Sequence, residues 1–169
     1  CNDVRSICED REGNLWIGTN TGGLNRFDPS TETFTRYQHQ PGNPNSLGFD
    51  FAVSLYIDRA GLIWVGGLDA VDRFDPETDT FVHYRHDPDD PTTISPGQVH
   101  SICQDREGTL WFGNRAGGGL SRFTSFAASA DDRRSIDNAG HFCHYRHDPD
   151  DPHSISDDSI QVVYIDQDG

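Results

Sequence analysis

The chain has 169 residues, of which 33% are hydrophobic, 17 are glycine and 9 are proline, and its formal net charge is -15. This composition argues against a helical bundle and favours short strands joined by turns, since 23 of the 28 acidic residues are aspartate, a turn former. A surface this negative repels nucleic acid and anionic membranes, and no stretch approaches the ~20 apolar residues of a membrane span.

The first segment of the chain is expected to form four strands, at residues 4–9, 14–19, 23–28 and 33–38. Between the first two strands, Asp10 and Gly13 predict a tight turn, because aspartate accepts hydrogen bonds from the amides ahead of it and glycine tolerates a positive φ. Trp16 follows, and its large apolar area is best buried against a neighbouring segment. Gly18 is expected to allow close backbone approach.

The same signature returns twice along the chain, so its positions are structural first. The repeated set is Asp10, Gly13 and Trp16, then Asp58, Gly61 and Trp64, then Asp105, Gly108 and Trp111. Trp16 precedes Trp64 by 48 residues, and Trp64 precedes Trp111 by 47. A period of this length with four short strands per unit is typical of a β-propeller blade, and no helical periodicity competes with it.

The fold is therefore predicted to be all-β, a partial β-propeller of three four-stranded blades plus the first strand of a fourth. Within one unit of residues 1–169, the blades are expected at 4–51, 52–98 and 99–159, with the fourth starting in 160–169. An insertion at 124–141 is expected to be an exposed loop between the third and fourth strands of blade three. Because no blade precedes the first, Trp16 or its neighbours Leu15 and Ile17 should be more exposed than Trp64.

The four cysteines, at positions 1, 8, 103 and 143, are predicted to be free thiols. Cys8 and Cys103 occupy the same position in blades one and three, a whole blade apart. A disulfide needs Cα atoms within about 7 Å, so the propeller fold excludes this pair.

Three histidines, His39, His86 and His147, occupy equivalent places in the linkers that join one blade to the next. This equivalence indicates a role in shaping the linker. Together with the nearby aspartates, these histidines could instead form an oxygen-rich cation site of the Ca²⁺ type; the aspartates are Asp87, Asp89 and Asp90, or Asp148, Asp150 and Asp151. A solvated acidic turn is the simpler interpretation, and we predict no metal and no cofactor.

The repeated string Val-x-Ser-Ile-x-x-Asp-x-x-Gly-x-Leu-Trp-x-Gly, followed by Gly-Leu-x-Arg-Phe-Asp-Pro and a His-Asp-Pro linker, resembles the two-component regulator propeller repeat. The resemblance covers nearly the whole chain outside the insertion. It implies the extracytoplasmic sensor region of a membrane-bound histidine kinase or related receptor, in a propeller of about seven blades. It also implies a periplasmic or extracellular location, with the remaining blades and an extracellular ligand, such as a carbohydrate, as partners.

The linkers and the connections between second and third strands should share one face, because the chain alternates direction within each blade. Asn20, Asp69 and Arg115 lie in these connections and differ between repeats, so they are the candidate ligand-binding residues. Arg115 is suited to a carboxylate or sulfate group, although pairing with a nearby aspartate in the surface loop is the simpler interpretation.

These features predict a non-catalytic, ligand-sensing propeller module of a membrane-bound, two-component-type signalling receptor. An adhesion or protein-binding propeller is the main alternative, and a polysaccharide lyase or hydrolase is a further one. Glycoside hydrolysis requires two carboxylates in one cleft, and the sequence singles out no such pair.

Overall fold

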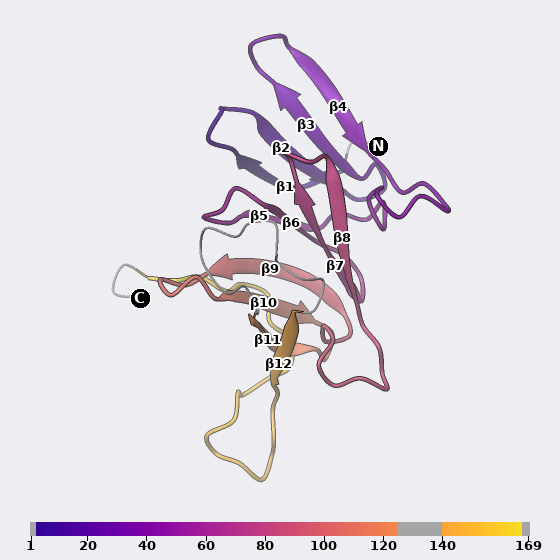
Figure 1. Cartoon of the computed structure of the whole chain (residues 1–169). Helices are drawn as coiled ribbons and strands as arrows, with labels where there is room; N and C mark the ends of the chain where they lie inside the picture. Colours follow the sequence, from indigo (N-terminus) through magenta and orange to yellow (C-terminus); the bar gives the residue numbers. More distant parts are fainter. Residues whose placement is uncertain (1–2, 125–139, 167–169) are drawn as a thin grey trace.

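The computed structural model describes residues 3–124 and 140–166, and every regular element in that part of the chain is a β-strand. The strands form three antiparallel sheets that follow one another along the chain (Figure 1). The first sheet contains β1 (Val4–Glu9), β2 (Leu15–Thr19), β3 (Leu24–Asp28) and β4 (Thr33–Tyr37). The second contains β5 (Ser54–Ile57), β6 (Ile63–Gly66), β7 (Ala70–Asp75) and β8 (Thr80–Arg85). The third contains β9 (Gln98–Gln104), β10 (Leu110–Arg115), β11 (Gly119–Thr124) and β12 (His141–Tyr145).

Each sheet is a meander in which consecutive strands pair with one another. In the first sheet the observed strands agree with the expected ranges to within one residue at each end. The sheets are arranged as blades, because the first strand of each contacts the first strand of the next: β1 contacts β5, and β5 contacts β9. The prediction of an all-β, partial propeller is confirmed, and we call the three sheets blades one, two and three.

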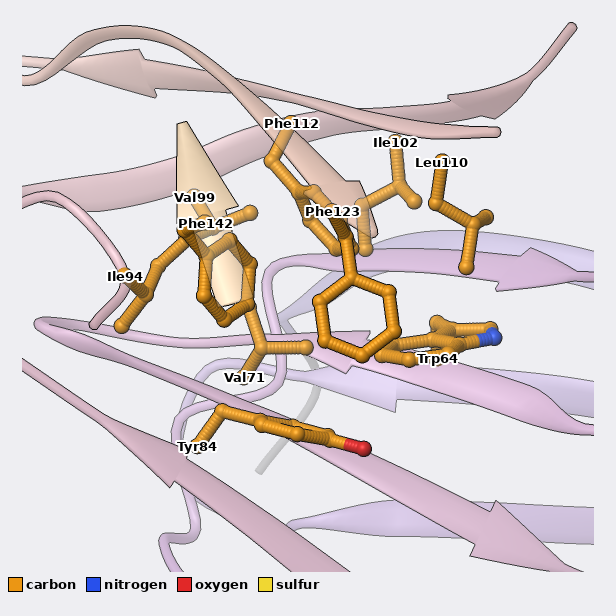
Figure 2. Packing of buried hydrophobic residues seen from close by; sticks show 10 residues of the cluster. All are labelled: Trp64, Val71, Tyr84, Ile94, Val99, Ile102, Leu110, Phe112, Phe123 and Phe142. Carbon is orange, nitrogen blue, oxygen red and sulfur yellow. The ribbon is translucent and has the colours of Figure 1, made fainter. Parts of the chain in front are cut away.

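Blades two and three pack through a cluster of aromatic side chains. Trp64 is only 2% exposed, and its ring centroid lies 5.7 Å from that of Phe112 and 5.3 Å from that of Phe123. Both pairs meet edge to face, a favourable aromatic geometry. Figure 2 shows Trp64 and Tyr84 of blade two facing Phe112 and Phe123 of blade three. The expectation that Trp64 lies buried between two blades is confirmed.

In the first blade the tryptophan itself is buried. Trp16 is 1% exposed, so the greater exposure expected of Trp16 or its neighbours is found at the neighbours. Its ring points toward blade two, where it joins a cluster that includes Ile63. Leu15 and Ile17 alternate to the opposite face of β2 and are only half-buried, as expected for residues on the open side of blade one. At the other end of the arc, Trp111 is partly exposed.

Residues 160–166 lie where the first strand of a fourth blade would run. The Val163 N–H donates to Ser101 Oγ at 2.9 Å, just as the Leu55 N–H donates to Ser6 Oγ at 3.2 Å between blades one and two. The segment therefore continues the arc. Within the described residues, no sheet ladder forms along this segment.

The glycine that follows each repeat tryptophan by two residues lies against the next blade. A Cβ atom at Gly66 would meet Ser54 Oγ and lie 2.6 Å from the Val99 carbonyl oxygen, and one at Gly18 would lie 2.8 Å from the Ala52 carbonyl oxygen. The predicted close backbone approach is confirmed at both positions.

Two further expectations concern the insertion and the cysteines. Residues 125–139 lie outside the described residues, so the exposed loop expected at 124–141 stays a prediction. Cys8, Cys103 and Cys143 are free thiols, which confirms that Cys8 and Cys103 do not pair.

Candidate functional site

The repeat aspartate joins the tight turn and the tryptophan of each blade. Asp58 Oδ1 accepts the N–H groups of Ala60 and Leu62 at 2.9 and 3.0 Å, and Asp58 Oδ2 accepts the Trp64 indole N–H at 2.8 Å. The other two blades make the same indole bond at 2.8 Å. The turn glycines Gly13, Gly61 and Gly108 have φ values of 85, 85 and 90°. These positions serve the scaffold, because their polar groups are used within the blade.

The linkers and the connections between second and third strands lie on one face, as the alternation of strand direction requires. In each blade a backbone N–H of the connection donates to a backbone carbonyl of the linker. The bonds are Gly23 N–H to Asp50 carbonyl at 3.0 Å, Asp69 N–H to Gly97 carbonyl at 2.9 Å, and Gly119 N–H to Asp158 carbonyl at 2.8 Å. We call this the linker face.

The three candidate ligand-binding residues lie on the linker face but do not converge on a cavity. Asn20 is partly exposed and donates its N–H to the Asp3 carbonyl at 3.0 Å. Arg115 is exposed at the end of β10 and pairs with Gln98 in the sheet ladder. A role for these residues in ligand selection stays a prediction.

Asp69 differs from the other two candidates, Asn20 and Arg115, for a structural reason. In blades one and three an aspartate, Asp50 or Asp158, accepts the N–H of the linker histidine through Oδ1 at 2.8 and 2.6 Å. Gly97 occupies that position in the second linker and has no carboxylate. Asp69 compensates: its carbonyl accepts the His86 N–H at 2.9 Å, and its Oδ1 accepts the Gly97 N–H at 2.6 Å.

The linker histidines brace their loops in all three linkers. The Nδ1 atom of His39 lies 3.0 Å from the Leu47 carbonyl oxygen, and the corresponding distances at His86 and His147 are both 2.9 Å. Because a carbonyl only accepts, Nδ1 carries the proton in each case. The loop-shaping role predicted from their equivalence therefore has a direct structural basis.

The aspartates beside these histidines cap their own turns. Asp87 Oδ1 accepts the Asp89 N–H and Asp148 Oδ1 accepts the Asp150 N–H, both at 2.9 Å. Within residues 3–124 and 140–166, no group of three or more His, Cys, Asp or Glu side chains is placed to hold a metal ion. The described linkers therefore give the cation-site alternative no support.

One cavity opens on the linker face, between the first linker and β8, with a volume of about 300 Å³. Its lining includes three basic side chains, His39, His83 and Arg85, and no acidic one. The other lining residues are Gln40, Gly42, Asn43, Pro44, Ser46, Leu47 and Gly48. We call this the blade-two cavity.

A buried carboxylate lies behind the blade-two cavity. The Asp72 side chain is fully buried, and its Oδ2 accepts the Gly48 N–H at 2.6 Å. Its Oδ1 lies 2.7 Å from His83 Nδ1 and 4.0 Å from Arg85 Nη1. His83 Nε2 lies 2.9 Å from the Pro44 carbonyl oxygen. Both ring nitrogens thus face acceptors, an arrangement that only the imidazolium satisfies.

The charge state of His83 agrees with its pKa. The hydrogen bond to Asp72 raises the pKa of His83, and partial burial offsets only some of this rise. Arg85 is also fixed in place: its Nη2 donates to the Gly48 carbonyl at 3.2 Å, and its guanidinium carbon lies 5.4 Å from the Phe49 ring centroid. The side chain of Arg85 remains 46% exposed.

Blade three replaces this charged group with a neutral one. His144 takes the position of His83, and its Nδ1 lies 2.8 Å from Ser95 Oγ and 3.0 Å from Ser121 Oγ. Burial is the main cause that lowers the pKa of His144, and the nearby Arg146 cation adds to the effect. Hydroxyl groups can donate to a neutral imidazole, so no carboxylate is needed here.

Asp72, His83 and Arg85 were not predicted from the sequence. A signal was available, because Asp72 fills the variable place in the repeated string Leu/Val-x-Arg-Phe, where blades one and three carry Asn25 and Ser121. A buried residue that varies within an otherwise repeated string marks a blade-specific contact.

A second cavity, of about 630 Å³, lies between blades one and two beside their turns. It is lined by acidic and basic residues together, among them Asp10, Arg11 and Asp75. Each of these is engaged locally: Asp10 with Trp16, Arg11 Nη2 with the Arg59 carbonyl at 2.7 Å, and Asp75 with the Glu77 N–H at 2.8 Å.

The comparisons with known proteins agree with this fold. The sequence model of the two-component regulator propeller family matches residues 1–21 and 93–116. A comparison with curated proteins gives no match. Among the described residues, none belongs to a helix long and apolar enough to cross a membrane.

Two similar solved structures are extracellular domains from B. thetaiotaomicron, BT4673 and BT3049, each assigned to a hybrid two-component system. BT4673 is 20% identical with a TM-score of 0.71, and the match covers 97% of this chain and 19% of that one. BT3049 is 25% identical with a TM-score of 0.69, covering 86% and 18%. The chain thus spans about a fifth of the length of these domains.

Virginiamycin B lyase from Staphylococcus aureus, solved with quinupristin, is more distant. It is 17% identical with a TM-score of 0.58, and the match covers 86% of this chain and 41% of the lyase. At this identity the likeness extends to the fold alone. The family match and the repeated strings agree: residues 1–21 and 93–116 are similar to the two-component regulator propeller repeat.

Proposed function

We propose that this chain is a ligand-sensing part of an extracytoplasmic propeller in a membrane-bound, two-component-type receptor. One observation carries the proposal: the chain matches the sequence model of the two-component regulator propeller, and its fold is similar to that of extracellular domains from hybrid two-component systems. The remaining blades of such a propeller would be the chain's structural partners, covering the open sides of blades one and three.

In this proposal the ligand binds on the linker face. Residues there differ between blades, whereas the residues that hold blade to blade recur. A ligand can change signalling only if it binds the two states of the receptor unequally. Linkers connect consecutive blades, so a ligand held against a linker is well placed to act on how the blades are presented.

We further propose that the chain acts without catalysis. A general base needs a free lone pair within reach of a substrate proton. At the blade-two cavity, His83 uses both ring nitrogens as donors, to Asp72 and to the Pro44 carbonyl, so no base is available on this ring. Turnover of an acidic polysaccharide by the chain would overturn this part of the proposal.

The reading frame that encodes this chain tests the receptor role. We expect it to continue into a membrane-spanning segment followed by a histidine kinase or cyclase sequence. A frame that completes the propeller and then encodes only a surface-attachment or further binding module would favour the adhesion alternative instead.

A further inference from the structure

We propose that the blade-two cavity binds the carboxylate of a small anionic ligand, with Arg85 as its main contact. The inference rests on the proposed sensing function only in treating that ligand as the signal. Binding itself can be measured without any signalling partner.

The charges around the cavity support an anion. The chain carries 28 acidic residues and a net charge of -15, yet three basic side chains and no acidic one line this cavity. Two carboxylates contact residues of the lining: Asp72 is fully buried behind His83 and Arg85, and Asp50 Oδ1 accepts the His39 backbone N–H at 2.8 Å. Asp72 carries one negative charge and faces two cations, the His83 imidazolium at 2.7 Å and the Arg85 guanidinium at 4.0 Å, so the group keeps one surplus positive charge for a ligand.

The geometry of Arg85 also suits a carboxylate. Its Nη2 atom is held by the Gly48 carbonyl and its guanidinium by the Phe49 ring, so little side-chain freedom remains to be lost on binding. The planar guanidinium has five N–H donors, more than these contacts use, and presents a fork that matches carboxylate oxygens. Its exposed fraction of 46% leaves it accessible.

The size of the cavity limits the ligand. A volume of about 300 Å³ lies at the small end of the range for small-molecule sites. Pro44 gives the cavity an apolar side, and His39 adds a polar group at the linker. The cavity therefore fits a single small ring or chain that carries one carboxylate.

Blade three provides a matched control. Arg146 takes the position of Arg85, but it points to Ser95 Oγ at 3.4 Å and lines neither of the two cavities described above. A substitution of Arg146 thus removes the same charge from the equivalent place in the fold without touching the proposed site.

Titration calorimetry of the chain with D-glucuronate, and with D-glucose as the uncharged counterpart, tests the proposal. We expect glucuronate to bind, glucose to bind far more weakly, and Arg85→Gln to weaken glucuronate binding about tenfold or more, since a charge-assisted hydrogen bond is lost. Arg146→Gln should leave the affinity unchanged. No glucuronate binding, equal binding of glucose, or an equal loss in both variants would overturn the proposal.

Chemical-shift mapping on the wild-type chain keeps the test decisive if Arg85→Gln does not fold. Glucuronate should shift the backbone amides of residues 39–49 and 83–85, and shifts confined to other regions would overturn the site. Failure of either experiment would leave the expected reading frame unchanged, so it would be distinguishable from failure of the sensing function.

Discussion

His83 and His144 occupy the same position in the fourth strands of consecutive blades, yet their partners give them opposite charge preferences. His83 donates to the buried carboxylate of Asp72 at 2.7 Å, whereas His144 lies between the hydroxyl groups of Ser95 and Ser121. The same backbone position thus holds a cation in one blade and a neutral ring in the next. The difference comes from the third strand, which carries Asp72 in blade two and Ser121 in blade three, and from the linker residue Ser95.

Titration of the histidine ring signals by NMR should separate these two residues. We expect the pKa of His83 to lie above the ordinary value of 6.5 and that of His144 to lie below it. Asp72→Asn should lower the pKa of His83 and leave His144 unchanged, because Asp72 contacts only the first. Equal pKa values for the two rings in the wild-type chain would contradict this assignment.

The raised pKa of His83 also predicts a pH dependence of stability. Its contribution is fully present below 6.5 and is lost as pH rises through the higher pKa of the folded state. The lowered pKa of His144 acts in the opposite sense, since its contribution is lost as pH falls below 6.5. Urea unfolding at several pH values should therefore show that the free energy of unfolding declines on the alkaline side, and Asp72→Asn should remove this decline. An unchanged decline in the variant would contradict the pairing of His83 with Asp72.

Trp64→Ala should reduce the free energy of unfolding by about 3–5 kcal/mol, as for other fully buried aromatic residues. The matched substitution Trp111→Ala should cost less, because Trp111 is partly exposed on the last blade. Urea or thermal unfolding measures both. Equal losses for the two variants would mean that the face beyond blade three is covered as fully as the interface between blades two and three.

Gly66→Ala tests the close approach between blades. Its Cβ would meet Ser54 Oγ and the Val99 carbonyl oxygen, 2.6 Å away, so blade three would have to move. We expect a loss of about 1–3 kcal/mol, the usual cost of overpacking a rigid site. The control is Gly61→Ala, whose Cβ would have no neighbour within 4 Å but would sit at a φ of 85°. A larger loss for the control would show that turn strain outweighs the inter-blade contact.

The cysteines should differ in reactivity. Burial, with the nearby Asp10 carboxylate, raises the pKa of the Cys8 thiol to about 11, so almost no thiolate is present at neutral pH. Cys143 is exposed. Alkylation with iodoacetamide followed by mass spectrometry should modify Cys143 well before Cys8, and the reverse order would contradict the burial of Cys8.

The repeat made the scaffold predictable. Asp58, Gly61 and Trp64 recur at fixed spacing, and three copies of one pattern specify both the strands and the tight turn that joins them. The sequence left open whether Trp16 or its neighbours Leu15 and Ile17 would be the more exposed, because it does not say toward which neighbouring blade the tryptophan points. The repeat period alone is compatible with either direction.

The candidate site was less predictable for a physical reason. Asp72, His83 and Arg85 come from two strands and contact linker residues that lie 24, 39 and 37 residues earlier in the chain. Their proximity depends on how blade two packs against the first linker, a tertiary contact with no local pattern. Variation at the position of Asp72 within the repeated string was the only sign of it in the sequence.

Phosphorylation of the complete receptor in membrane vesicles tests the sensing claim most directly. We predict that D-glucuronate changes the level of phosphorylation in the wild-type receptor and in Arg146→Gln, and that Arg85→Gln responds only at higher concentrations. Phosphorylation that stays constant while glucuronate saturates the blade-two cavity would contradict the claim that this propeller senses its ligand.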